Sequence, residues 1–466
     1  MALVVAALSA LSLMPAASAA ERLLRVSDNG RFLVRTDGEP FFYLGEAAYF
    51  LFYNLTLEET DRYFRNRAAK GFTVIEAGLT RGMPQGVTIH GYTTFLPRAD
   101  DPAKDDIARP NEKFFRYIDD VVALAERHGL FLAIAPIWDK LDATLEENTG
   151  YAYGEFLGRR YRGKPIIWMV SSDSDPKGNE HRLRALARGL VAGHGGTQLM
   201  TLKPRGGASS SRYFHGDDWL DFNMIQGSHQ HFRPEGSARP ALVARDYALQ
   251  PAKPTMDSES GFENIPEGLT RRGQRSMWEK VPVQERLTQH HVRRVAYWTI
   301  FAGAHGFTYG ANGVYQFSKP AIPHTMRWDP EMTWEQALEL PAASQMRLLK
   351  ALLFSRPYLS RVPDQSMIAS SNGEREERIQ ATRSADGSYA MIYSAFGRSF
   401  SVQLDKISGP VRASWYDPAT GEVRDAGRFA NRGIHEFRPP KKSIGQDWVL
   451  VLDDASRNFP VPGEQR

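Results

Sequence analysis

Residues 166–177, "IIWMVSSDSDPK", contain the pattern that best predicts the fold of this chain. An apolar, β-branched run of this kind is typical of a buried strand. Here it ends in serines and aspartates, so the strand would deliver Asp173 and Asp175 to its carboxyl end. Two interpretations are open. The aspartates belong either to a turn with a helix N-cap, or to the catalytic mouth of a parallel barrel.

Apolar runs alternate with helical patterns on both sides of this stretch. "FTVIEAGL", "LFLAIAPIW" and "TQLMTLKP" are further candidate strands, and eight such runs end on a polar residue. Thr56 with Glu59 forms a capping-box pattern at the start of one helix, and Asn111 precedes another. Helices are also expected at 283–304 and 334–354. Eight strands separated by helices predict an α/β fold, a (β/α)8 TIM barrel. A doubly wound sheet would need a Gly-rich phosphate turn, which "YLGEAAYF" does not provide.

The sequence changes character near Pro363. Short runs such as "SYAMIYSAF" and "DWVLVLDD" are β-rich and are separated by Gly and Pro, which predicts a small antiparallel β-sandwich. "WYDPATGEV" predicts a tight turn between two of its strands. We expect a signal peptide at 1–20, a barrel with an N-terminal β-hairpin at 21–358, the sandwich at 359–456 and a tail at 457–466. The chain has no low-complexity linker, so the two domains should pack closely.

The segment 1–20, "MALVVAALSALSLMPAASAA", has the features of an export signal. Its apolar run is followed by Pro15 and by Ala17-Ser18-Ala19, which has the A-x-A form of a cleavage site. No Lys or Arg precedes the run, which departs from the usual pattern. A membrane anchor is the alternative, but about 14 apolar residues are fewer than the roughly 20 that a span needs. We therefore expect a periplasmic or secreted protein.

The composition excludes several classes of function. The 466 residues include no cysteine, which rules out disulfides, thiol nucleophiles and cysteine-based zinc sites. The net charge is +4 and the basic residues are dispersed, so no nucleic-acid partner is expected. No P-loop, G-x-S-x-G or H-E-x-x-H motif is present. We expect no cofactor, no membrane span in the mature protein, and a monomer.

In a parallel barrel, the side chains at the carboxyl ends of the strands converge on one face. Carboxylates, an amide, imidazoles and aromatic rings in one basin suit a sugar, because hydroxyls need polar partners and the sugar ring stacks on aromatic side chains. Asp173 ends the fourth predicted strand and Glu259 the seventh, and glycoside hydrolysis requires two such carboxylates. These two are the candidate catalytic residues. The candidate substrate-binding residues are Glu46, Tyr49, Glu76, His90, Trp138, Lys203, Gln226, His229 and Tyr309.

Other assignments remain open for individual residues. Asp175 is an alternative to Asp173 as the acid, or a turn or cap residue, and Glu263 is the alternative to Glu259. His229 and His231 alternate on one strand face and could hold a metal ion, but the sequence shows no third ligand, so we predict no metal. The aromatic candidates could instead belong to the core.

Several motifs occur together in a recognisable order. They include "NGRFLVRTDGEPFFYLGE", "GRRYRGKPIIWMVSSD", "WLDFNMIQGSH", "KPTMDSESGFEN" and "GFTYGANGVYQF". With them the chain resembles the apiosidase-like glycoside hydrolases, which belong to the clan of retaining (β/α)8 glycosidases and often have a C-terminal β domain named for collagen binding. The resemblance implies that Asp173 is the acid/base and Glu259 the nucleophile. The chain departs from the family at Ser171-Ser172, where Gly-Gly is usual, and at Lys203, where a histidine is usual.

The resemblance implies an exported, retaining glycoside hydrolase that removes a terminal furanose, apiose or a related pentose, from a polysaccharide or oligosaccharide. One alternative is an endo-acting glycanase of the same clan. Another is a non-catalytic carbohydrate- or matrix-binding protein. For a retaining enzyme we expect the two carboxyl groups to lie about 5–5.5 Å apart. We also expect the C-terminal domain to pack on the barrel and not to bind collagen.

Overall fold

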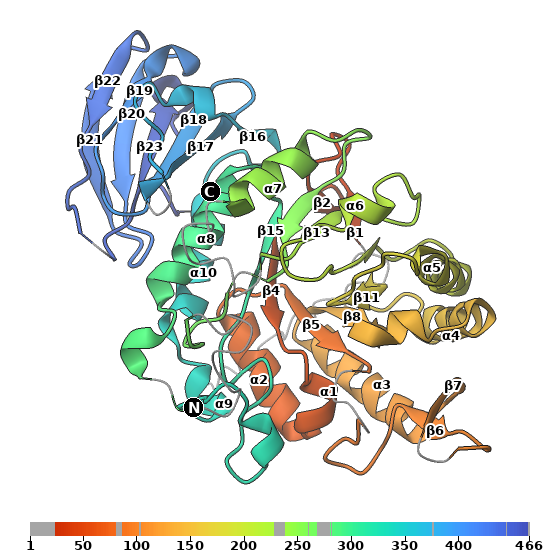
Figure 1. The fold of residues 1–466 in the computed structure, drawn as a ribbon. Helices are drawn as coiled ribbons and strands as arrows, with labels where there is room; N and C mark the ends of the chain where they lie inside the picture. The colour runs from red at the N-terminus through yellow and green to blue at the C-terminus, as the bar shows by residue number, and fades with distance from the viewer. Residues whose placement is uncertain are drawn as a thin grey trace, which may run out of the picture.

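The computed structural model describes residues 24–80, 86–101, 104–227, 238–259, 261–267, 280, 282–374, 377–443 and 445–464. The predicted signal peptide lies outside these residues, and so do His229 and His231. Figure 1 shows a barrel with surrounding helices and, coloured blue, a C-terminal β domain beside it. Within the described part of the chain, no helix is both long and apolar enough to cross a membrane.

The barrel contains eight parallel strands, which confirms the predicted fold class. They form one sheet in which β15 pairs with β4, and the ladder is interrupted between β12 and β13. There, the backbone N–H of Asp221 donates to the Met200 carbonyl over 2.9 Å, so the barrel is nearly closed. The strands in chain order are β4 (Tyr43–Ala47), β5 (Val74–Gly78), β8 (Phe131–Ala135), β10 (Ile166–Met169), β12 (Met200–Thr201), β13 (Asn223–Ile225), β14 (Thr255–Asp257) and β15 (Gly306–Tyr309).

The barrel strands are covered on both faces, and this explains their sequence pattern. All four residues of β10 are buried, because one face lines the barrel and the other packs under helices. A strand buried on both sides has a continuous apolar run instead of alternating polar and apolar residues. The described helices of this domain are α1 (Leu51–Asn54), α2 (Leu57–Ala69), α3 (Glu112–Arg127), α4 (Glu147–Arg160), α5 (Glu180–His194), α6 (Ser211–Phe214), α7 (Ala238–Tyr247), α8 (Gln289–Phe301), α9 (Trp334–Ala337) and α10 (Pro341–Phe354).

The predicted helix starts are confirmed where capping residues define them. Thr56 Oγ1 accepts from the backbone N–H of Glu59 over 3.2 Å, and the Glu59 carboxylate accepts from the Thr56 N–H over 2.9 Å. Asn111 accepts from the N–H of Lys113 and caps α3. Each cap satisfies a backbone donor that the first helical turn leaves unpaired.

Two expected helices are shorter than predicted. The region 283–304 begins with a 3-10 turn, Val283–Glu285, and α8 starts only after Thr288. The region 334–354 is divided into α9 and α10 at Pro341. Proline lacks an N–H and its ring clashes with the preceding turn, so it starts a new helix instead of continuing one.

Short strands extend both ends of the barrel. The predicted N-terminal hairpin is a three-stranded sheet of β1 (Leu24–Val26), β2 (Leu33–Arg35) and β3 (Pro40–Phe41). At the carboxyl ends of the barrel strands, three further elements follow. They are the pair β6 (Phe95–Pro97) and β7 (Asp105–Pro110), the pair β9 (Ile137–Trp138) and β11 (Ser171–Ser172), and the 3-10 helix η2 (Asp139–Ala143).

The C-terminal domain is an antiparallel β-sandwich, as predicted. Along β18 and β23 alternate side chains belong to two different cores: Tyr393 and Val451 join the core of the barrel, while Ile392 and Leu450 join the core of the β domain. The larger sheet has the order β16 (Arg361–Pro363), β17 (Ile379–Ser384), β18 (Tyr389–Ser394), β23 (Trp448–Asp454), β20 (Val411–Tyr416) and β21 (Val423–Phe429), and the smaller one pairs β19 (Phe400–Gln403) with β22 (Ile434–Phe437).

The two domains pack directly against each other, which confirms the expectation drawn from the missing linker. The ring of Tyr297 on α8 stacks on that of Tyr393, with centroids 4.8 Å apart. Arg356 makes a buried ion pair with Asp453, with Nε 2.7 Å from Oδ1. The predicted turn between β20 and β21 is also present, closed by a 2.8 Å hydrogen bond from the Gly421 N–H to the Asp417 carbonyl.

Candidate active site

Asp173 lies just beyond β11, at the carboxyl end of the fourth barrel strand. Its φ of 52° is in the left-handed region, which residues other than glycine seldom adopt and which is often found at functional sites. Helix α5 begins seven residues later, with Asn179 at its N-cap. Asp173 therefore does not cap this helix, and the interpretation of Asp173 as a helix N-cap is wrong. The carboxylate instead accepts hydrogen bonds from Trp138 Nε1 over 2.9 Å and from Gln226 Nε2 over 2.6 Å.

Asp142 on η2 supports the segment that contains Asp173. Its carboxylate accepts from Ser171 Oγ over 2.6 Å and from the hydroxyl of Ser174. Burial raises the pKa of Asp142 to about 6, and the two hydroxyls oppose this rise. Ser171 and Ser174, on either side of Asp173, are thus both hydrogen-bonded to the loop that follows the third barrel strand. Sequence reasoning missed Asp142, because this partner lies some 30 residues away and belongs to no motif.

Glu259 lies two residues beyond the seventh barrel strand, and 7% of it is exposed. Its Oε2 atom accepts from Lys203 Nζ over 2.7 Å, from Tyr49 Oη over 2.8 Å and from Gln226 Nε2 over 2.9 Å. Burial and the charge of Glu259 raise the pKa of Tyr49, which keeps its hydroxyl protonated as a donor. Three donors, one of them an ammonium group, stabilise the carboxylate in its ionised form.

Gln226 connects the two candidate catalytic carboxylates. Because its Nε2 atom lies 2.6 Å from Asp173 Oδ1 and 2.9 Å from Glu259 Oε2, these two oxygens are at most 5.5 Å apart. Retaining glycosidases have a separation of about 5–5.5 Å, whereas inverting ones leave about 6.5–9.5 Å for a water molecule. The limit applies to one oxygen of each carboxylate, and it is compatible with the shorter spacing between the two groups.

Glu76 lies beneath this pair, inside the barrel. It is fully buried, its Oε2 atom is 4.0 Å from Lys203 Nζ, and Oε1 accepts from Thr308 Oγ1 over 2.6 Å. Burial raises the pKa of Glu76 to about 7, and the charge of Lys203 opposes the rise. Lys203 lies between Glu76 and Glu259 in the described contacts. The position of Glu76 therefore favours a role in holding Lys203 over direct contact with a substrate.

Asp257 and Arg239 hold the backbone around Glu259. Asp257 Oδ1 accepts from the N–H groups of Gly227 and Glu259, each over 3.2 Å. Arg239 Nη1 donates to Asp257 Oδ2 over 2.9 Å and to the Glu259 carbonyl over 3.1 Å. A Cβ atom on Gly227 would lie 2.0 Å from Arg239 Nη1, so a larger residue there would push the guanidinium group away from Asp257 and Glu259. Sequence reasoning missed Asp257 and Arg239, although Asp257 precedes Glu259 by two residues.

Aromatic rings surround Tyr49. Its centroid lies 4.9 Å from that of Trp138, 6.0 Å from Phe262 and 6.4 Å from Tyr315. Phe262 and Tyr315 were not among the predicted site residues. Each follows a barrel strand by several residues, and no local pattern distinguishes such loop aromatics from core ones.

Glu46 and Tyr309 do not face this site, contrary to the expectation from their strand ends. They are register partners on β4 and β15 and point into the layer between barrel and helices. Glu46 Oε1 accepts from Arg67 Nη2 of α2 over 2.8 Å, and Tyr309 Oη donates to Glu263 over 2.8 Å. Alternate side chains of a strand point to opposite sides, so a residue at a strand end can face either way.

The remaining candidates lie elsewhere. The ring of His90 packs on Tyr117, with centroids 5.0 Å apart. Asp175 is exposed and accepts a hydrogen bond from Tyr213 Oη over 3.1 Å. It does not cap α5, because the N-cap of that helix is Asn179. Glu263 accepts from the N–H of Ala342 at the start of α10 over 3.1 Å, away from the carboxylate pair. His229 is outside the described residues, and within them no cluster of His, Asp or Glu side chains could hold a metal ion.

The chain is similar to known glycoside hydrolases over most of its length. The family described as "Apiosidase-like, catalytic domain" matches residues 27–360, and "Putative collagen-binding domain of a collagenase" matches residues 362–453. A solved structure titled "Glycoside hydrolase" is 32% identical, with 94% of this chain and 98% of that chain covered and a TM-score of 0.84. A glycoside hydrolase family 5 structure from Bacteroides vulgatus ATCC 8482 is 30% identical, with 95% of each chain covered and a TM-score of 0.84. No curated protein matches the chain significantly.

Proposed function

This chain belongs to the apiosidase-like family of glycoside hydrolases, and we propose that it removes a terminal furanose from a complex glycan with retention of anomeric configuration. The observation that supports retention is the single amide of Gln226 within hydrogen-bond distance of both Asp173 and Glu259. The choice of apiose or a related pentose rests on the family alone.

In the first step, Glu259 attacks the anomeric carbon while the bond to the leaving oxygen breaks. Asp173 gives its proton to that oxygen, and the sugar becomes covalently bound to the Glu259 carboxylate. In the second step, Asp173 takes a proton from water, whose oxygen attacks the anomeric carbon and releases Glu259. Two inversions at one carbon give net retention.

The surrounding residues have separate roles in this scheme. Lys203 and Tyr49 keep Glu259 ionised and oriented, as a nucleophile requires. Trp138 holds one oxygen of Asp173. Gln226 has two amide hydrogens, so one donor group can orient both carboxylates while they stay close together.

The experiment compares kcat/KM on an apiose-terminated oligosaccharide and on an aryl apioside. Asp173→Asn should lower kcat/KM on the oligosaccharide by about 10²–10⁴-fold, the usual cost of losing a general acid. The loss should be smaller on the aryl glycoside, because a phenolate departs with little protonation. Glu259→Gln should inactivate the enzyme on both substrates, since no leaving group replaces the missing attack.

Asp175→Asn is the matched control, because it removes a carboxylate two residues from Asp173 without touching the pair. It should leave both rates close to wild type. Equal losses on both substrates for Asp173→Asn would show that the proton donor is elsewhere. NMR of the first sugar released should show the configuration of the substrate, and an inverted product would refute retention.

The same experiments address the alternative functions. Products shortened from within a polymer chain would indicate endo action, and sugar binding without turnover would indicate a non-catalytic protein. We also propose export, on the basis of the segment 1–20, and action as a monomer. Protein secreted by a host cell should begin near Ala20 or Glu21, and an intact segment 1–20 would contradict export.

A further inference from the structure

The chain segment that contains Asp173 pairs regularly with only one of its two neighbours. Trp168 on β10 lies opposite Ile134 on β8. Three residues further along each chain, Ser171 on β11 lies opposite Ile137 on β9. On this side, therefore, no residue is inserted between the two pairs.

The pairing on the other side, with the fifth barrel strand, is irregular. Met169 lies opposite Thr201 on β12, and the pairing resumes where Ser174 lies opposite Pro204. Between these two positions the Asp173 segment advances by five residues and its neighbour by three, so two residues are inserted. Such an insertion is a β-bulge, which bends the strand and changes the direction of a side chain. Asp173, with its φ of 52°, lies within this bulge.

Asp142 spans the bulge with a single carboxylate. Its Oδ1 atom accepts from Ser171 Oγ over 2.6 Å, and its Oδ2 atom accepts from the hydroxyl of Ser174. These two serines lie on either side of Asp173, so the carboxylate fixes the separation between the two ends of the bulge. Asp142 is only 2% exposed, and both of its oxygens are engaged, so it has no free surface for a substrate.

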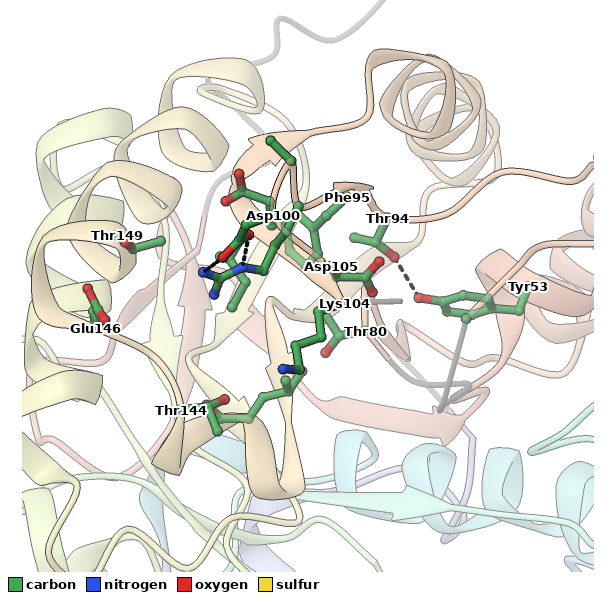
Figure 2. Close-up of a pocket in the computed structure, with 16 residues that line it drawn as sticks. Tyr53, Thr80, Thr94, Phe95, Asp100, Lys104, Asp105, Thr144, Glu146 and Thr149 are labelled. Carbon is green, nitrogen blue, oxygen red and sulfur yellow. Dashed lines mark hydrogen bonds and ion pairs between the residues drawn. The ribbon is translucent and has the colours of Figure 1, made fainter. Parts of the chain in front are cut away.

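The element that carries Asp142 also borders a hollow of about 730 Å³. Leu141 and Thr144 line this hollow, and Figure 2 shows Thr144 at its wall. Asp142 does not line the hollow and points to the bulge instead. Because η2 borders a hollow, packing supports it less than it supports the barrel strands, which are covered on both faces. The hydrogen bonds of Asp142 are therefore important for connecting η2 to the Asp173 segment.

The shape of the bulge determines where the carboxylate of Asp173 lies. In its present position this carboxylate accepts from Trp138 Nε1 over 2.9 Å and from Gln226 Nε2 over 2.6 Å. Gln226 also donates to Glu259, so a shift of Asp173 would change its distance from the proposed nucleophile. A general acid must be within hydrogen-bond reach of the atom that receives its proton, and a misplacement of about 1 Å can lower the rate substantially.

We propose that Asp142 is a positioning residue for the general acid. By holding Ser171 and Ser174, it maintains the bulge and directs Asp173 toward the leaving oxygen. This role rests on the proposed function, in which Asp173 protonates that oxygen.

Glu259 is held by different residues. The Asp257 carboxylate accepts from the N–H of Glu259 over 3.2 Å, and Arg239 donates to its carbonyl over 3.1 Å. Loss of Asp142 should therefore impair proton transfer and leave the nucleophilic attack largely unchanged. A merely structural role would instead lower the activity on every substrate by the same factor.

The test measures kcat/KM on the apiose-terminated oligosaccharide and on the aryl apioside. Asp142→Ala should lower kcat/KM about 10–100-fold on the oligosaccharide but less than about threefold on the aryl apioside, because a phenolate departs with little protonation. Asp142→Asn should stay within about threefold of wild type on both substrates, because its amide can accept from one serine and donate to the other. In an Asp173→Asn background, Asp142→Ala should cause no further loss on the oligosaccharide, since the acid is already absent.

Ser174→Ala is a milder variant that keeps the test valid if Asp142→Ala does not fold. It removes one of the two hydrogen bonds and leaves the other, from Ser171, in place. It should show the same selective loss on the oligosaccharide, with a smaller factor.

Asp454→Ala is the matched control. Asp454 in the β domain is 4% exposed and also accepts from two serine hydroxyls, Ser408 Oγ over 2.8 Å and Ser456 Oγ over 2.7 Å. Its loss should lower the melting temperature but leave kcat/KM close to wild type on both substrates.

Equal losses on both substrates for Asp142→Ala, or multiplicative losses in the double variant, would overturn the inference. So would a loss in Asp142→Asn as large as that in Asp142→Ala. If Asp173→Asn itself lost activity equally on both substrates, the acid in the proposed function would be wrong, and a crystal structure of Asp142→Ala would decide the positioning role. An Asp173 displaced from Trp138 in that structure would support the inference, and an Asp173 still bonded to Trp138 would refute it.

Discussion

Lys203 Nζ donates to Glu259 Oε2 over 2.7 Å, and both side chains are almost completely removed from solvent. The lysine also contacts Tyr49 Oη and lies 4.0 Å from Glu76. It is therefore the positive charge that offsets the acidic residues at the centre of the barrel. The structure places this lysine in direct contact with the proposed nucleophile.

Lys203→Met should impair catalysis by removing this charge. We expect kcat to fall by about 10–100-fold, since a hydrogen bond to a charged group contributes roughly 1.5–3 kcal/mol. The acidic limb of the rate profile should move to higher pH, because Glu259 is harder to ionise without the ammonium group. The measurement is kcat/KM between pH 4 and 9.

Lys253→Met is the matched control for this prediction. Lys253 is half-buried and donates to two carbonyls at the other end of the barrel, those of Asp217 over 2.9 Å and Leu220 over 2.6 Å. Its loss should lower stability without moving the pH profile. A profile unchanged in Lys203→Met would show that Lys203 has only a structural role.

Glu263 should make stability depend on pH. Burial raises its pKa to about 7, so the folded protein keeps a proton there that the unfolded chain loses above its ordinary value near 4.5. The stabilising contribution is complete below about pH 4.5 and is lost as pH rises to about 7, with an upper limit of about 3 kcal/mol. The free energy of unfolding should therefore fall less steeply from pH 5 to 8 in Glu263→Gln than in wild type.

Urea unfolding at four pH values measures this slope. Exposed Glu147→Gln is the control and should leave the slope unchanged. The activity of Glu263→Gln should stay near wild type, because Glu263 contacts Tyr309 and Ala342 and not the carboxylate pair. An identical slope in wild type and Glu263→Gln would contradict the raised pKa.

The buried ion pair between the domains should be important for stability. Arg356→Met leaves Asp453 buried with only the partial compensation of Arg412, and we expect a loss of about 3 kcal/mol. Arg438→Met breaks an exposed pair with Glu436 and should cost less than about 1 kcal/mol. Chemical unfolding measures both losses. Comparable losses of unfolding free energy would show that the buried ion pair contributes no more to stability than the exposed one.

The C-terminal domain should not bind collagen in the full-length protein. One face of its larger sheet packs on the barrel through residues such as Tyr393, and the other forms the core of the sandwich through residues such as Ile392. The central strands of the larger sheet are therefore covered on both faces and are not open to a large partner. Saturable binding of the full chain to immobilised collagen, absent for an unrelated β-sandwich protein, would refute this prediction.

Local patterns in the sequence were enough to predict the architecture. The apolar run of β10, the capping box of Thr56 and the turn after Tyr416 depend on neighbouring residues, and the structure contains all three. The boundaries were less accurate where a local breaker was overlooked, as at Pro341. The alternation of strands and helices was likewise sufficient to predict a barrel, because only a few topologies bury such a pattern.

The sequence by itself determined the two domains and put Asp173 and Glu259 at the ends of barrel strands. Only the tertiary structure decided that the amide of Gln226 reaches both carboxylates, that Asp142 and Asp257 hold their backbones, and that Glu46 and Tyr309 face the helices. The physical reason is that a strand end is a local property, whereas the direction of a side chain and its partners depend on barrel closure. Barrel closure brings together residues that are tens or hundreds of positions apart in the sequence. No local sequence pattern indicates which of these residues come into contact.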